Sequence, residues 1–207
     1  MLMTVVCSSA MQDEEAKRIL DEVSAKTRSY QTISADFTFT MDNKEMNIHE
    51  ENKGSIQLKG KKYLVNLPDV GMKIYSDGVS VWNYMEDGNQ VTISAIDSEN
   101  NELMDPSALF NLYEQGFDSK YIGEKKINNK IFHELELYPN EDEHEVSKIS
   151  LLVDKSKMMI SSATLFGTDD NLYKINIIDF KTNVDLPDSY FEFNAGEYDD
   201  LEVIDFR

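Results

Sequence analysis

The dominant pattern along this chain is an alternation of apolar and polar residues with a period of two, which predicts β-strands. The clearest example is the segment 35–41, where Ala, Phe, Phe and Met alternate with Asp and Thr. Similar runs recur at short intervals, among them 46–50, 54–59 and 131–138, and the last that we expect is 188–194. Such spacing predicts sequential antiparallel strands joined by tight turns, about ten or eleven in all.

The centre of this pattern is a predicted β-hairpin over residues 73–84. Its two strand-like runs meet at the Asp-Gly dipeptide 77–78, which favours the positive φ angles of a tight turn. The second strand has valines 79 and 81 on one face and Trp82 and Tyr84 on the other, so both faces are apolar. Two explanations are open: a strand buried on both sides in a sandwich, or a barrel strand with one face on the core and the other on a lid or cavity.

Two segments follow a helical period instead. Between Asp13 and Arg28, apolar or small residues recur at spacings of three and four, with acidic residues first and basic residues last, as the helix dipole favours. Between Asp105 and Phe117, an Asp suited to the N-cap and a Pro suited to the first turn precede four large apolar residues. The four are Leu109, Phe110, Leu112 and Tyr113. Because they occupy more than half of the helix surface, we expect the helix to cover another part of the protein.

The charge of the chain narrows the range of partners. Its 207 residues fit one domain, and they include 20 Lys and Arg against 39 Asp and Glu, a net charge of -19 at pH 7. A protein this acidic repels nucleic-acid backbones and anionic lipid surfaces. We therefore expect no nucleic-acid binding and no attachment to membranes through a basic patch.

The N-terminus has the features of an export signal. Residues 2–10 are apolar or small and end in Ser8-Ser9-Ala10, which fits signal-peptidase cleavage close to Met11. The apolar run is short and no basic residue precedes Lys17, as expected of a signal peptide truncated at its start. We therefore predict a signal peptide at 1–10, which includes the single cysteine, and one exported domain at 11–207 that is soluble in the periplasm.

No motif for catalysis or metal binding stands out. The acidic run 141–145 contains His144, but neighbouring residues on an extended loop point apart and do not converge on one ion. The sequence also has no Gly-x-Ser-x-Gly elbow, no Gly-rich phosphate loop and no His-Glu-x-x-His motif. We expect neither an enzyme nor a cofactor or metal.

The remaining signal is a large set of aromatic and methionine side chains. Composition alone favours an ordinary β-protein core. Methionine also lines adaptable binding surfaces because its flexible thioether repacks at low cost. A cavity for a lipid or another hydrophobic ligand is the second explanation.

Several motifs, taken in order, resemble the periplasmic outer-membrane lipoprotein carriers, the LolA-like family. The strongest is Ser76-Asp77-Gly78-Val79-Ser80-Val81-Trp82-Asn83-Tyr84, which looks like the family's Ser-Asp-Gly-x-x-Leu-Trp-x-Tyr. Others are Gly54-Ser55-Ile56-Gln57-Leu58-Lys59, Leu135-Glu136-Leu137-Tyr138-Pro139, Ile149-x-Leu151-x-Val153-Asp154 and Ile175-x-Ile177-x-x-Phe180-x-x-Asn183. Each motif is weakly specific, and their shared order along nearly the whole chain carries the resemblance.

This resemblance implies a mainly β (α+β) fold: an incomplete, strongly curved antiparallel β-barrel covered by the N-terminal helix and a mid-chain lid helix. It implies a chaperone that holds lipoprotein acyl chains and carries them from the inner to the outer membrane without catalysis. The donor would be an inner-membrane lipoprotein-releasing ABC transporter. The acceptor would be an outer-membrane receptor or the membrane itself, and the carrier would act as a monomer.

The same resemblance suggests which residues line the hydrophobic cavity and its lid. They are Phe37, Phe39, Ile56, Leu58, Tyr63, Val65, Trp82, Tyr84, Leu109, Phe110, Leu112 and Tyr113. Where family members carry a lid-latching Arg, Lys59 is the best positional match. A latch through Lys59 would be looser, because Lys offers a point charge in place of a planar fork of donors.

A second function on the same fold is a regulatory or sensor domain, which would bind a lipid or a partner protein without shuttling. A stable partner of signalling character would distinguish it from a carrier.

Overall fold

The computed structural model describes residues 8–96, 116–140 and 146–207 and, for side chains, begins at Glu14. These residues form one α-helix, α1 (Ser8–Ser29), and a twelve-stranded sheet. The strands are β1 (Ile33–Asn43), β2 (Ile48–Lys59), β3 (Lys62–Leu67), β4 (Met72–Ser76), β5 (Ser80–Met85), β6 (Gln90–Ala95), β7 (Phe117–Ile127), β8 (Lys130–Pro139), β9 (Val146–Asp154), β10 (Met159–Gly167), β11 (Leu172–Thr182) and β12 (Glu202–Asp205).

The sheet is open and mostly antiparallel. Its order is β12-β6-β5-β4-β3-β2-β1-β11-β10-β9-β8-β7, so β12 and β7 are the two edges. The β12–β6 pair is parallel. A mainly β fold with an open antiparallel sheet and an N-terminal helix is thus confirmed. The predicted lid helix at 105–117 falls outside the described residues except at its end, where Phe117 begins β7.

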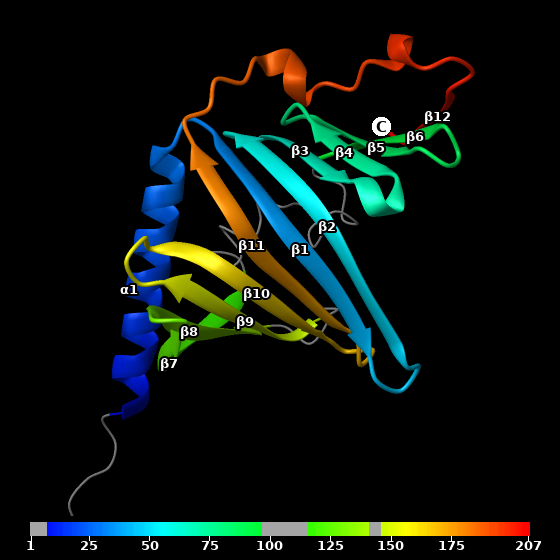
Figure 1. Cartoon of the computed structure of the whole chain (residues 1–207). Coiled ribbons are helices and arrows are strands. Elements are labelled where there is room, and N and C mark those ends of the chain that lie inside the picture. The colour runs from blue at the N-terminus through cyan, green and yellow to red at the C-terminus, as the bar shows by residue number, and fades with distance from the viewer. Residues whose placement is uncertain (1–7, 97–115, 141–145) are drawn as a thin grey trace, which may run out of the picture. The chain divides into compact units, whose positions relative to one another are not determined.

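The chain forms two compact units. The first contains α1, β7 to β10 and parts of β1, β2 and β11, and the second contains β3 to β6, β12, the remaining parts of those strands and the C-terminal segment. Within the first unit, α1 lies beside β7 and β10 (Figure 1). No helix within the described residues combines the length and the apolar character needed to cross a membrane.

The core of the first unit lies between α1 and the strands. Helical spacing places Ala16, Ile19, Leu20 and Val23 on one buried face of α1. On the strands, the pairs Leu135–Leu151 and Leu137–Ile149 are also fully buried. Burying a Leu or Ile side chain contributes about 1.5 to 3 kcal/mol, so this set is a main source of the unit's stability.

Three local predictions need correction. Segments 46–50 and 54–59 are not separate strands but belong mostly to the single strand β2. Helix α1 begins at Ser8, so the acidic residues 13–15 are not in its first turn. The predicted strand 188–194 is instead a 3₁₀ turn, Asp188–Phe191, followed by extended chain, and the last strand is β12.

The predicted central hairpin is confirmed as β4 and β5. These strands pair antiparallel from Met72–Met85 to Ser76–Val81. Only the glycine of the Asp77-Gly78 dipeptide takes a positive φ, 90°, and the aspartate acts as a hydrogen-bond acceptor instead. Val79 lies in the turn and is 70% exposed, so it does not extend the apolar face of the strand.

The signal peptide at 1–10 and the single domain after it stay predictions. Residues 1–7 lie outside the described part of the chain.

Candidate functional site

One face of the sheet in the second unit carries a continuous apolar surface. The cross-strand pairs Ile56–Val65 and Leu58–Tyr63 place four predicted cavity residues on this face, because directly paired residues share a face. The pairing continues from Val65 to Ile74 on β4 and through Ser76 to Val81 on β5. We call this surface the inner apolar face. All of its apolar members are buried: Ile56, Leu58, Tyr63, Val65, Ile74 and Val81.

Gly54 allows an aromatic ring to lie on the same face. A Cβ at Gly54 would be 2.6 Å from Phe37 Cζ and 2.7 Å from Leu67 Cδ2, closer than real Cβ atoms come to neighbours. Phe37 is itself buried. Alternation along β1 gives Phe39 the same side of its strand as Phe37. The glycine is therefore required by close approach of the Phe37 ring.

Trp82 and Tyr84 lie on the opposite face of this sheet. Trp82 pairs with Tyr75, and these two residues alternate along their strands with Val81 and Ile74. Tyr84 contacts the rings of Phe193 and Tyr198, with centroid distances of 5.6 and 4.5 Å. A cavity on one face therefore includes either these two aromatic residues or the six of the inner apolar face, not both groups.

Tyr75 on this second face has an unusually high pKa. Burial raises the pKa of Tyr75 to about 12, and the neighbouring Tyr198 adds to the shift. The Phe193 ring lies 5.6 Å from that of Tyr75 and stacks on Tyr198 at 5.1 Å. Tyr75 therefore keeps its proton throughout the physiological pH range. Sequence reasoning missed Phe193 and Tyr198 as site residues, although three aromatic residues within 190–193 mark the segment.

Lys59 binds the C-terminal segment. Its Nζ donates to the carbonyl oxygen of Leu186 at 2.7 Å and lies 2.8 Å from Asp188 Oδ1. Lys62 Nζ lies 2.9 Å from the other oxygen, Oδ2. Hydrogen bonds from both lysines lower the pKa of Asp188 to about 2. A latch between Lys59 and the predicted lid stays a prediction, since residues 97–115 are outside the described chain.

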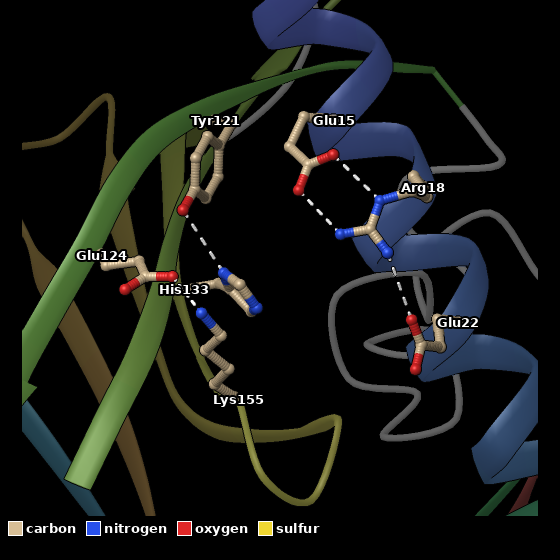
Figure 2. Close-up of polar contacts among 7 residues, drawn as sticks. All are labelled: Glu15, Arg18, Glu22, Tyr121, Glu124, His133 and Lys155. Atoms are coloured by element: carbon tan, nitrogen blue, oxygen red, sulfur yellow. Dashed lines mark hydrogen bonds and ion pairs between the residues drawn. The ribbon is translucent and has the colours of Figure 1, made fainter.

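Two groups of polar side chains lie where α1 packs beside β7 in the first unit, one on α1 and the other on the strands (Figure 2). Arg18 forms a two-pronged salt bridge with Glu15, at 2.7 and 2.9 Å, and reaches Glu22 at 3.4 Å. His133 is buried, and its Nδ1 lies 3.4 Å from the hydroxyl oxygen of Tyr121.

The surroundings of His133 favour its neutral form. Burial lowers its pKa first, and nearby Lys155 lowers it further, although Glu124 and Glu15 oppose the change. Lys155 itself is paired with Glu124 (Figure 2). His133 therefore acts as a neutral core residue facing α1.

Two other predicted groups of residues lie outside the described part of the chain. The predicted lid residues Leu109, Phe110, Leu112 and Tyr113 and the acidic run 141–145 lie outside the described residues. Within 8–96, 116–140 and 146–207, no group of three or more His, Cys, Asp and Glu side chains is placed to hold a metal ion. What the described chain does contain is the inner apolar face, a set of buried apolar side chains on neighbouring strands.

Sequence comparison decides the family. Residues 28–194 match the model of the outer membrane lipoprotein carrier protein LolA. The chain belongs to the LolA family. The match spans β1 to β11 and the aromatic segment 190–193, so it includes both faces of the sheet described above. No curated protein matches the chain.

Solved structures share the LolA fold at low sequence identity. An uncharacterized conserved protein from Thermus thermophilus has a TM-score of 0.62 and 15% identity, with 92% of this chain and 99% of that chain covered. An outer membrane lipoprotein-sorting protein domain from Vibrio parahaemolyticus has a TM-score of 0.52 and 14% identity, with coverages of 86% and 97%. A DUF1329 family protein from Desulfovibrio piger has a TM-score of 0.51 and 16% identity, with the same coverages. At these identities the likeness establishes the fold.

Proposed function

We propose that this protein is a periplasmic carrier that shelters the acyl chains of lipoproteins and takes them from the inner to the outer membrane. The observation that carries the proposal is membership of the LolA family over residues 28–194. The fold shared with the lipoprotein-sorting domain from Vibrio parahaemolyticus is in keeping with it.

The inner apolar face is the surface on which we place the acyl chains. An acyl chain gains about 0.8 kcal/mol per buried CH₂, so it leaves a membrane only for comparable shelter. Six buried apolar side chains on neighbouring strands offer such contact. Leu109, Phe110, Leu112 and Tyr113 would cover the chains as a lid.

The carrier acts by binding and release, without catalysis. Its donor is an inner-membrane lipoprotein-releasing ABC transporter, and its acceptor is an outer-membrane receptor or the membrane itself. The mature chain crosses the periplasm after removal of residues 1–10. Release requires that the cover over the acyl chains can open, as lids do in many binding proteins.

The test begins with the protein purified from the periplasm. Lipid mass spectrometry is expected to find bound lipoprotein or acyl chains, and membranes bearing the transporter are expected to load the empty protein. Reproducible absence of bound lipid together with no loading would contradict the proposal. A stable partner of signalling character, captured in place of lipid, would favour the regulatory domain.

Two adjacent residues of β2 offer a matched pair of variants. Ile56 lies on the inner apolar face, whereas Ser55 points to the opposite side. Ile56→Asn is expected to reduce loading severalfold, because a buried amide disfavours contact with hydrocarbon, and Ser55→Asn to leave it unchanged. Thermal denaturation of both variants separates lost loading from lost folding. Equal loading by two folded variants would remove this face from the site.

A further inference from the structure

The segment between β11 and β12 is attached to the sheet in an unusual way. We call residues 184–201 the C-terminal strap; it crosses β3 to β6 in orange and red in Figure 1. Backbone hydrogen bonds anchor the chain just before it, from Asn183 to Thr32, and just after it, from Glu202 to Asn89. Within the strap, the backbone–backbone hydrogen bonds of the described residues are all local, three residues apart. Contacts that involve side chains therefore hold the strap against the sheet.

The first fastening is the carboxylate of Asp188. It lies between Lys59 and Lys62, 2.8 and 2.9 Å from their Nζ atoms, at the end of the β2–β3 hairpin. The 3₁₀ turn that begins at Asp188 ends at Phe191, whose side chain is fully buried. Asp188 is itself 59% exposed, so water and salt can compete for both lysines.

The second fastening is aromatic. Phe193 lies against Tyr75 and Tyr84, each at 5.6 Å, and Tyr198 stacks beside it at 5.1 Å. A hydrogen bond from Asn89 Nδ2 to the carbonyl oxygen of Asp199, at 2.8 Å, follows these rings. The strap thereby covers Tyr75 and Tyr84, on the face of the sheet that also carries Trp82.

Electrostatic repulsion opposes both fastenings. Residues 184–201 contain six Asp and Glu and neither Lys nor Arg, in a chain of net charge -19. The salt bridges that the described residues make to the strap are both at Asp188. Like charges repel over about 8 to 10 Å at ordinary ionic strength. The pairing of Asp188 with Lys59 and Lys62 therefore opposes the repulsion from the other five acidic residues of the strap.

We propose that the C-terminal strap is a detachable cover, fastened by the Lys59–Asp188–Lys62 bridge, whose release exposes the aromatic face of Tyr75, Trp82 and Tyr84. Segments held by few side-chain contacts and without a strand ladder open at a fraction of the global unfolding free energy. β12 stays paired with β6 through its own backbone bonds, so opening leaves the sheet intact. The proposal does not depend on the carrier function.

Trp82 is the only tryptophan of the chain and reports on this opening. In the full-length mature protein, Asp188→Asn is expected to raise the acrylamide quenching constant of Trp82 about twofold, because removing the charge frees the strap. Amide hydrogen exchange is expected to rise across 186–201 while β8 and β9 stay protected. Asp185→Asn removes an acidic residue from the same strap without touching either salt bridge and is expected to behave as the wild type.

A charge reversal at Asp188 distinguishes an effect of the Lys59–Asp188–Lys62 bridge from a general effect of the strap's negative charge. Asp188→Lys makes the strap less acidic yet places a third positive charge beside Lys59 and Lys62, so it is expected to open the strap at least as far as Asp188→Asn. If Asp188→Asn leaves both Trp82 quenching and exchange of 186–201 at wild-type values, the proposal is wrong. It is also wrong if Asp185→Asn opens the strap equally, or if Asp188→Lys leaves the strap closed with β8 and β9 protected.

Discussion

Gly54 shows at the scale of single residues how a missing side chain shapes the inner apolar face. Its φ is unexceptional, and what the position requires is space for the Phe37 ring and for Leu67. A motif that begins with this glycine was visible in the sequence, but the residue that needs the space lies on another strand.

Gly54→Ala is expected to lower the free energy of unfolding by about 1 to 3 kcal/mol, because an added methyl group in a filled core displaces its neighbours. Urea denaturation measures the change. Gly88→Ala is the matched control, since a Cβ there would meet Gln90 Cβ at an ordinary 3.7 Å. Combining Gly54→Ala with Phe37→Leu should cost less than the sum of the two single changes; simple additivity would contradict the packing explanation.

His133 makes stability depend on pH. Burial lowers its pKa in the folded state below the usual 6.5, so between these two pKa values the unfolded chain binds more protons. The free energy of unfolding is therefore expected to rise with pH through this window. The part of it that neutral His133 contributes is lost as pH falls below about 6.5. Urea denaturation between about pH 5 and 8 measures the slope.

A variant assigns that slope. His133→Asn is expected to reduce the slope, because this variant has no imidazole at position 133 to bind a proton. A slope that is unchanged in His133→Asn would place its origin in another group.

At the scale of elements, the β4–β5 hairpin depends on its turn. Asp77 Oδ1 accepts hydrogen bonds from the backbone N–H groups of Val79 and Ser80, both at 2.8 Å. The Asp-Gly pair correctly predicted the turn from the sequence, but its two residues have different roles. Gly78 supplies the positive φ and Asp77 satisfies two backbone donors.

Asp77→Ala is expected to destabilise the protein by about 1 to 2 kcal/mol, because two backbone donors lose their acceptor. Asp77→Asn keeps an oxygen in the same place and is expected to remain within about 0.5 kcal/mol of the wild type. Chemical denaturation compares the two variants. An equal loss in both would show that charge, and not the acceptor geometry, stabilises the turn.

The C-terminal elements show where periodicity misleads. The Phe191-Glu192-Phe193 alternation predicts a strand, yet the chain turns at Asp188–Phe191. A strand also needs a neighbour to accept its backbone hydrogen bonds, and the strap has none among the described residues between Asn183 and Glu202. Its aromatic rings pack onto a sheet face instead. A period of two in the sequence does not distinguish such a segment from a strand.

At the scale of the whole molecule, the net charge of -19 opposes the compact state. Raising NaCl from about 10 to 150 mM is expected to increase Tm, because the Debye length shortens from about 30 to 8 Å and self-repulsion weakens. Differential scanning calorimetry at the two NaCl concentrations measures the change in Tm. Glycerol at matched osmolality controls for effects other than screening, and a Tm that falls with added salt would mean that attractive pairs outweigh repulsion.

By itself the sequence determined the β class, the N-terminal helix, the tight turns and the family. These follow from period, turn dipeptides and motif order, all of which lie along the chain. Only the tertiary structure decided that Trp82 and Tyr84 face away from the inner apolar face and that Lys59 binds the strap. Faces depend on strand register, and the Lys59–Leu186 bond joins residues 127 positions apart. Contacts at that separation form when the sheet assembles, so no local pattern encodes them.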